Sequence, residues 1–563
     1  MTSNNAAEIK KKVGEYINGR LEEDKIAAVT FALSDGEEII CSGAYGYSDI
    51  ENKIPAREDM VVGVASVSKL FTATGIMQLE EAGKLNIENP INYYISEFSM
   101  KSRYNNSRLI KVKDLMTHHS GLPRDWLVHF YSWEPDPIGN LVEYLRNEYV
   151  TNPPGYFYNY SNLGVSLLGV VLERAAGIPF AEYMQENILN PLDMATSAFS
   201  LAPNVMPYCA KTYNRLEPAV EVPVRDKPAG GLYSNVIDLA KFAMMYACGG
   251  VYKGKRLLKN ETIERMLTPQ VLDVPLSFGT MIGLNWFIGR QNLDYAGRVA
   301  GHGGALVYHR TDLCILPEQG LSFVIMSNSS TGNAVFGKAC EIALQDAVYL
   351  KTGRSPEKAQ SKPFFLRGNL RDDVPDGGYG TPDGYIFIYK KENDYMMRFE
   401  DNEYYLVFEN DSYIPKIKTE NGYEDDSKIS WMKMKFIYEP ELKRKIMLVN
   451  NQLYGERYEP EPVPEKWAER QGFYRAFNRR PEEDLNDIMN RMELEIKNEN
   501  LYATFIHDWY RQRRLLRPIN DFEAVRMGWG GAEGETLHAK PEEGEVLEFM
   551  GIKFRKEPNA HSS

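Results

Sequence analysis

Hydrophobic and polar positions at the start of the chain predict a helix and then a pair of strands. Apolar residues first recur every three or four positions, the spacing of one face of an amphipathic helix. Two β-rich runs over residues 27–49 then flank Asp35-Gly36, a dipeptide that favours tight turns, and predict a β-hairpin. The helical face comprises Ala6, Ile9, Val13 and Ile17.

A second helical pattern begins around Ser66 and stops at Gly83, a residue type common at helix ends. Its apolar positions fall on one face, so we expect an amphipathic helix with one buried side. That face comprises Val67, Leu70, Phe71, Thr74 and Met77.

The middle of the chain, residues 110–350, alternates helical and loop patterns before strand-like runs return. Strands at both ends with helices between them predict one antiparallel sheet with an inserted helical part, an α+β arrangement. The helical patterns cover 163–177, 235–250 and 334–351, and the strand-like runs cover 299–315 and 320–328.

Composition changes at residues 351–363, which are typical of a linker. Short alternating strands separated by Asn and Asp turns follow, and a proline-rich break at 458–466 divides them in two. The two parts end on similar strand pairs, which indicates a duplicated small barrel or sandwich, lipocalin-like if closed. We therefore expect domains at 1–355, 356–462 and 463–563, the last two all-β.

Charge and cysteine usage narrow the function classes. A net charge of −13 argues against binding to nucleic acid or to an anionic membrane surface. The N-terminus lacks the apolar core of a secretory signal, and no run of 18 apolar residues predicts a membrane span. Five scattered cysteines without a C-x-x-C pair predict reduced thiols in a cytoplasmic protein rather than a disulfide framework or zinc site. The sequence implies no metal or cofactor.

The first candidate for chemistry is Ser66, which precedes Lys69 by three residues at a predicted helix start. Residues at i and i+3 are neighbours on a helix, so the amine can take the proton that a serine must lose to become a nucleophile. The same spacing occurs at Ser355 and Ser430, but the first lies in the linker and the second in a strand-like run. Only Ser66 opens a helix.

Two further motifs carry suitable side chains. Tyr160-Ser-Asn162 directly precedes a helical run, and it offers a phenol for proton transfer and an amide for a substrate carbonyl. His302-Gly-Gly304-Ala305 lies in a strand-like run, where glycine permits close approach of another backbone.

In this order, Ser66-Val-Ser-Lys69, Tyr160-Ser-Asn162 and His302-Gly-Gly304 resemble the three motifs of the serine β-lactamase and penicillin-binding-protein superfamily. The branch is that of class C β-lactamases, D-alanyl-D-alanine carboxypeptidases and D-aminopeptidases. The segments 115–123 and 228–242 are similar too, and the likeness covers roughly residues 5–350. It implies an antiparallel sheet flanked by helices with an inserted helical subdomain.

The resemblance also implies roles for these residues. Ser66 would attack the carbonyl, while Lys69 and Tyr160 share the proton transfers. The N–H groups of Ser66 and Ala305 would form the oxyanion hole beside Gly304. Asn162 would hold either the substrate amide or the network of Lys69 and Tyr160.

Two other segments repeat a motif without its context. Tyr233-Ser-Asn235 precedes a helix, where Asn235 is best interpreted as an N-cap. Lys351-Thr-Gly353 spells the usual third motif of the family but ends the last helix of this region, where lysine and glycine are common.

His302 departs from the lysine that β-lactamases usually carry at this position. An unperturbed histidine titrates near pH 6.5, so a permanent cation for a substrate carboxylate is absent. We therefore expect a peptidase, amidase or esterase for small peptides or D-amino-acid derivatives, with a pH response through His302. A β-lactamase or carboxypeptidase remains an alternative.

A different class of function also stays open: a catalytically silent domain whose C-terminal β domains bind a partner. We further predict that one of those domains narrows the Ser66 cleft, because appended domains often shape a neighbouring site. The expected partner is a small-molecule or short-peptide substrate. The sequence determines neither the substrate nor the oligomeric state.

Overall fold

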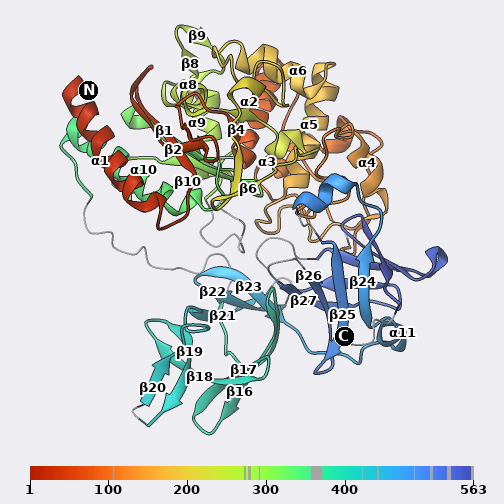
Figure 1. The fold of residues 1–563 in the computed structure, drawn as a ribbon. Coiled ribbons are helices and arrows are strands. Elements are labelled where there is room, and N and C mark those ends of the chain that lie inside the picture. The colour runs from red at the N-terminus through yellow and green to blue at the C-terminus, as the bar shows by residue number, and fades with distance from the viewer. Residues whose placement is uncertain are drawn as a thin grey trace.

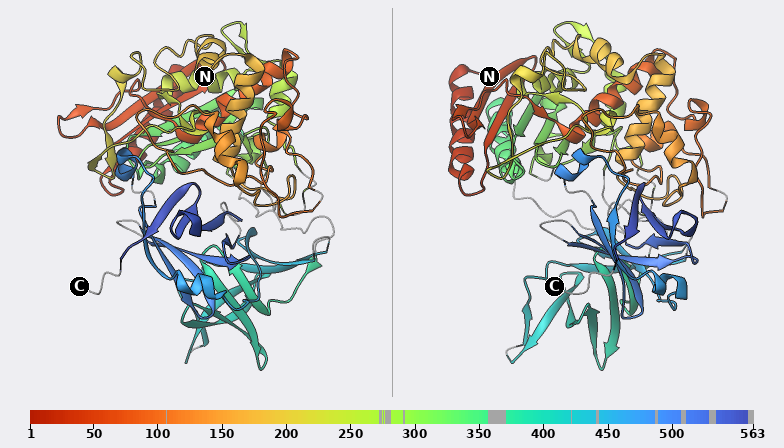
Figure 2. Two further views of the ribbon diagram at one scale, coloured as in Figure 1. Left: turned by 90° about the vertical axis from the view of Figure 1, so that its right-hand side faces the viewer. Right: turned by 45° about the vertical axis from the view of Figure 1, so that its right-hand side comes forward.

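A computed structural model of the chain shows a large N-terminal domain with two smaller β units against one side of it (Figures 1 and 2). The residues that the structure describes are 1–105, 107–271, 274, 276, 281–290, 292–356, 371–420, 422–440, 443–486, 489–506, 511–528 and 534–558.

The N-terminal domain is built on a seven-stranded antiparallel sheet with the order β10-β11-β12-β13-β1-β2-β3. The hairpin around Asp35-Gly36 is confirmed, and β1 pairs with β13, so strands from both ends of the domain meet at its centre. The bounds are β1 Ala28–Asp35, β2 Glu38–Asp49, β3 Ile54–Pro55, β10 Phe287–Ile288, β11 Ala300–Ala305, β12 Arg310–Leu316 and β13 Leu321–Ser327.

Both faces of this sheet are covered, and alternate side chains of β13 pack into a hydrophobic core on each side. Val324 and Met326 pack with the central helices α2, α5 and α8, whereas Phe323 and Ile325 pack with α1 and α10. This confirms the antiparallel sheet with inserted helices. The bounds are α1 Ser3–Leu21, α2 Ser68–Glu81, α5 Asn162–Ala176, α8 Val236–Ala247 and α10 Phe336–Thr352.

The prediction of a one-sided helix after Ser66 is wrong. Helix α2 is buried without interruption from Ser68 to Met77, because it packs against both α5 and α7 (Lys227–Gly230) inside the domain. Ser66 itself lies in a 3-10 turn, Ala65–Val67, that leads into α2. The other helices of this domain are α3 Val112–Met116, α4 Asn140–Tyr144, α6 Phe180–Met184 and α9 Asn260–Met266.

The first C-terminal unit is all-β, as predicted. Its ten strands have the order β14-β21-β22-β23-β15-β16-β17-β18-β19-β20, and β21 also pairs with β19. Residues 357–363 of the predicted linker lie outside the described residues. The bounds are β14 Arg371–Asp372, β15 Gly377–Thr381, β16 Gly384–Lys391, β17 Asp394–Phe399, β18 Asn402–Glu409, β19 Ser412–Thr419, β20 Gly422–Asp425, β21 Met434–Glu439, β22 Arg444–Val449 and β23 Gln452–Arg457.

The second unit is a closed eight-stranded barrel in which consecutive strands pair and β31 returns to β24. A short helix, α11 Glu465–Glu469, precedes it and places Trp467 in the barrel core. The bounds are β24 Gly472–Ala476, β25 Arg491–Lys497, β26 Asn500–Ile506, β27 Arg511–Pro518, β28 Glu523–Arg526, β29 Thr536–Lys540, β30 Val546–Phe549 and β31 Ile552–Lys556.

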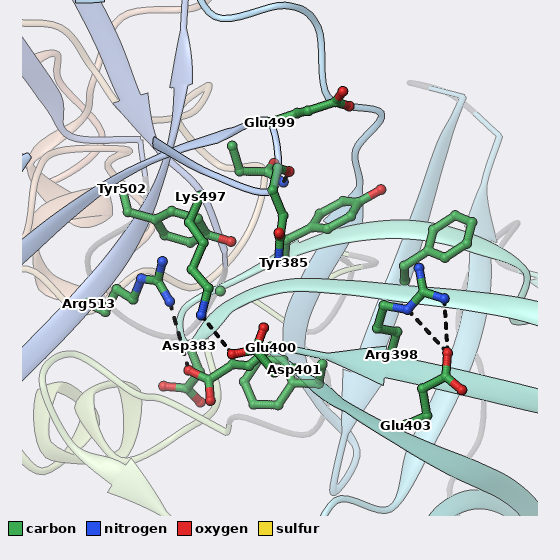
Figure 3. Close-up of a pocket in the computed structure, with 15 residues that line it drawn as sticks. Asp383, Tyr385, Arg398, Glu400, Asp401, Glu403, Lys497, Glu499, Tyr502 and Arg513 are labelled. Atoms are coloured by element: carbon green, nitrogen blue, oxygen red, sulfur yellow. Dashed lines mark hydrogen bonds and ion pairs between the residues drawn. The ribbon is translucent and has the colours of Figure 1, made fainter. Parts of the chain in front are cut away.

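A cavity of about 670 Å³ lies where the two β units meet (Figure 3). Ion pairs cross it from the barrel to the ten-stranded sheet: Lys497 Nζ lies 2.9 Å from Asp401 Oδ2, and Arg513 faces Glu400. These pairs tie the two units to one another.

By length and composition, no single helix among the described residues is suited to cross a bilayer, although the bent pair α5 and Phe180–Leu189 passes the same test together.

Candidate active site

Ser66 sits on a constrained turn between the sheet and α2. The preceding residue, Ala65, has a φ of 53°, a left-handed conformation that is rare for a residue with a side chain. On the facing strand, Gly304 approaches so closely that an added Cβ would lie 2.2 Å from the Val64 carbonyl oxygen. Close packing of β11 against this turn therefore requires glycine at position 304.

The structure brings the three predicted catalytic side chains together. Lys69 Nζ donates to Ser66 Oγ at 2.9 Å, and the Tyr160 hydroxyl donates to the same oxygen at 3.0 Å. Lys69 Nζ also donates to the Ala229 carbonyl oxygen at 2.7 Å. Ser66 Oγ is thus held between an amine and a phenol.

Burial sets the protonation of this group. Desolvation lowers the pKa of Lys69 to about 7, with the Asp125 carboxylate opposing the shift. Desolvation raises the pKa of Tyr160 to about 12, although its hydrogen bond to Ser66 and the Arg124 cation oppose this. The phenol therefore keeps its proton near neutral pH, and the amine is the group able to accept one.

His302 lies on β11 beside this group, with its ring centroid 6.3 Å from that of Tyr160 and 5.0 Å from that of Phe287. Its Nδ1 lies 2.6 Å from the Gly303 carbonyl oxygen, and only 4% of the residue is exposed. Burial lowers the pKa of His302 to about 3. The expected titration near pH 6.5 is therefore wrong, and the ring is neutral across the physiological range.

Ser66, Asn162 and Ala305 line one pocket of about 140 Å³. Asn162 is the first residue of α5, which is capped by the Ser161 side chain. The Asn162 amide donates to Asp125 Oδ1 at 2.7 Å, rather than to Lys69 or Tyr160. Asp125 is thus a protein partner of Asn162, and contact of Asn162 with the substrate stays a prediction.

Sequence reasoning missed several residues around Ser66. Asp125 and Tyr131 come from the loop that follows the segment 115–123, and Asp226 comes from just before 228–242. Both neighbouring segments are part of the family resemblance, and their position in the sequence could have indicated these site residues. His118 from the first segment accepts a hydrogen bond from the Ser161 N–H at 3.2 Å and packs against Tyr160 in a tilted arrangement, with ring centroids 4.4 Å apart.

The two repeated motifs lie elsewhere, as predicted. The Asn235 side chain accepts from the Asp238 N–H at 2.9 Å and caps α8. Lys351 lies in the last turn of α10, before Gly353, whose φ of 72° is the left-handed C-cap conformation. Over the described part of the chain, no three His, Cys, Asp or Glu side chains are grouped to hold a metal ion.

The profile of the family described as Beta-lactamase matches residues 13–346, more than half of the chain. The chain belongs to the beta-lactamase family. It is 26% identical over 407 residues to "Beta-lactamase-like protein 2" of Dictyostelium discoideum, across 67% of this chain and 72% of that protein.

Solved structures place this beta-lactamase family chain in the same fold. The octameric penicillin-binding protein homologue from Pyrococcus abyssi aligns with a TM-score of 0.51 and 21% identity, over 79% of this chain and 99% of that chain. SurE, solved with D-Leu, aligns with a TM-score of 0.58 and 18% identity, over 81% of this chain and 100% of that chain. At these identities the likeness shows the fold alone.

Proposed function

We propose that the protein is a serine hydrolase that forms an acyl-enzyme on Ser66. The observation that carries this proposal is the pair of hydrogen bonds that Ser66 Oγ receives from Lys69 and Tyr160 at the mouth of a pocket. A serine held between a base and a proton donor is the arrangement that nucleophilic catalysis requires.

In the proposed reaction, Ser66 Oγ bonds to the substrate carbonyl carbon and its proton passes to the unprotonated Lys69 amine. The N–H groups of Ser66 and Ala305 stabilise the negative oxygen that forms. Tyr160 donates a proton to the leaving amine or alkoxide as its bond to carbon breaks, and Lys69 returns a proton to Tyr160. Water then attacks the ester on Ser66 by the reverse transfers and releases the acid.

The proposed substrates are amides or esters of small peptides or D-amino-acid derivatives, as in the D-aminopeptidase and esterase branch. One observation supports this choice over a β-lactamase or carboxypeptidase: the neutral ring of His302 supplies no cation for a substrate carboxylate. SurE, which shares the fold, has been solved with D-Leu, so D-amino-acid derivatives are included among the proposed substrates.

A fluorophosphonate probe tests the acyl-enzyme. We expect the wild-type chain and Ser355→Ala, a matched serine of the same S-x-x-K spacing, to be labelled, and Ser66→Ala to lose labelling with its circular dichroism spectrum intact. Labelling that persists in Ser66→Ala would contradict the proposal. A folded wild-type chain that neither labels nor hydrolyses p-nitrophenyl esters would favour a non-catalytic binding protein instead.

A further inference from the structure

The charged side chains that line the Ser66 pocket are acidic. Among the described residues these are Asp125 and Asp226, whereas the Lys69 amine, which is hydrogen-bonded to Ser66 Oγ, is fully buried and is not one of the lining groups. The other lining side chains near them are apolar or aromatic: Leu127, Phe130, Tyr131, Val224 and Leu306. A pocket of this kind is suited to a ligand with a positive group next to an apolar one.

The two carboxylates are held differently. Asp226 is fully buried, and its Oδ1 accepts from Arg225 Nε at 2.7 Å, so a guanidinium balances its charge within the protein. Arg225 also donates to the carbonyl oxygens of Val128 and Trp126 at 2.8 Å. This pair therefore fixes the loop that carries Asp125.

Asp125 is the carboxylate available to a ligand. Its Oδ1 accepts from the neutral Asn162 amide at 2.7 Å, and its Oδ2 lies 3.4 Å from Arg124 Nε, beyond a short charge-assisted hydrogen bond. Arg124 is 39% exposed at its side chain, so water screens its charge, whereas Asp125 is only 14% exposed. A carboxylate has about four acceptor positions, so Asp125 keeps capacity for further donors.

We propose that Asp125 binds a free ammonium group of the substrate, so that the acyl group transferred to Ser66 is an aminoacyl group with an apolar side chain. This inference rests on the acyl-enzyme function proposed above. Asn162 then acts as a positioning residue that orients Asp125, and the apolar wall holds the side chain of the same residue. An ammonium group gives this partly buried carboxylate a second cationic partner beside Arg124, which favours the charged substrate over a neutral analogue.

The test compares leucine p-nitroanilide with N-acetyl-leucine p-nitroanilide, each as both enantiomers, on the full-length chain. We expect wild-type kcat/KM to favour the free amine at least tenfold for the accepted enantiomer. In Asp125→Asn this ratio should fall toward one, mainly through KM. Asp59→Asn, an exposed carboxylate paired with Arg57 outside the pocket, should keep the wild-type ratio.

A second measurement keeps the inference testable if Asp125→Asn fails to fold. Leucinamide should slow fluorophosphonate labelling of wild-type Ser66 at concentrations where N-acetyl-leucinamide does not. Equal protection of Ser66 by both amides, or equal kcat/KM for both anilides, would contradict the ammonium site. Labelling at Ser66 in the same experiment would still support the acyl-enzyme. Absence of labelling at Ser66 removes both proposals.

Discussion

At the scale of single residues, the local dielectric decides which group moves the proton. Lys69 is fully buried, so its ammonium form is not stabilised by water. Its hydrogen bonds go to the Ser66 hydroxyl and the Ala229 carbonyl, and no carboxylate of the described residues contacts it. Burial therefore brings its pKa to about 7, near the value that suits a general base in neutral solution.

This predicts the pH dependence of the reaction. The amine must be unprotonated to accept the Ser66 proton, so kcat/KM for an uncharged ester such as p-nitrophenyl acetate should rise with pH and level off above about pH 7. Below that midpoint the rate should fall about tenfold per pH unit. A rate that is flat between about pH 5 and pH 8 would show that Lys69 is not the base.

His302→Gln is the matched control for this profile. Because the pKa of His302 lies near 3, this substitution should leave the midpoint near 7. If the midpoint of the pH profile moves or disappears in His302→Gln, the titrating group is His302 rather than Lys69.

At the scale of elements, the hairpin of β11 and β12 brings Ala305 to the pocket that Ser66 also lines. Its turn is held by one buried carboxylate: Glu221 Oε2 accepts from the N–H groups of Tyr308 at 2.7 Å and His309 at 3.1 Å, and Oε1 accepts from Val307 at 3.2 Å. The hairpin is also tied to the strand before Ser66, because His309 Nδ1 accepts from the Gly63 N–H at 3.0 Å.

We predict that Glu221→Gln lowers kcat about tenfold with little change in KM. The amide has one acceptor oxygen and brings a donor toward backbone N–H groups, so the turn shifts and the oxyanion site loses alignment.

Glu173→Gln controls for the loss of a carboxylate that merely accepts a backbone N–H. Glu173 binds the Phe180 N–H at 2.8 Å, between α5 and α6. Both variants are expected to lower the melting temperature, and only Glu221→Gln should slow labelling of Ser66. Equal labelling rates in the two variants would reduce Glu221 to a structural role.

At the scale of the whole molecule, the barrel contacts the loop that forms one wall of the Ser66 pocket. The Leu127 N–H donates to the Met550 carbonyl oxygen at 2.9 Å, and the Arg124 N–H reaches the buried Glu535 carboxylate at 3.4 Å. Arg480 also pairs with Asp136 at 2.8 Å. These contacts support the prediction that a C-terminal domain shapes access to the site.

Arg480→Ala tests this coupling. Removing the guanidinium takes away one of the contacts between the loop and the barrel. We expect a KM increase of about tenfold for peptide anilides, since small displacements of positioning groups are costly. Arg475→Ala, which removes an exposed pair with Glu557 on the barrel, should leave KM unchanged. Equal KM values for Arg480→Ala and wild type would show that this contact with the barrel does not affect substrate binding.

Much of this fold could be predicted from local pattern. The hairpin at Asp35-Gly36, the helix caps at Ser161 and Asn235 and the all-β character of the C-terminal units depend on turn chemistry and short-range periodicity. The candidate site was predicted through the order of its three motifs.

The sequence by itself determined which side chains are present and which local elements carry them. Only the tertiary structure decided their surroundings: α2 is buried on all sides, the pKa of His302 falls, that of Tyr160 rises, and Asn162 binds Asp125. The physical reason is that periodicity and capping depend on neighbours within a few residues. Burial and charge pairing depend on segments tens to hundreds of residues apart, which meet only when the chain has folded.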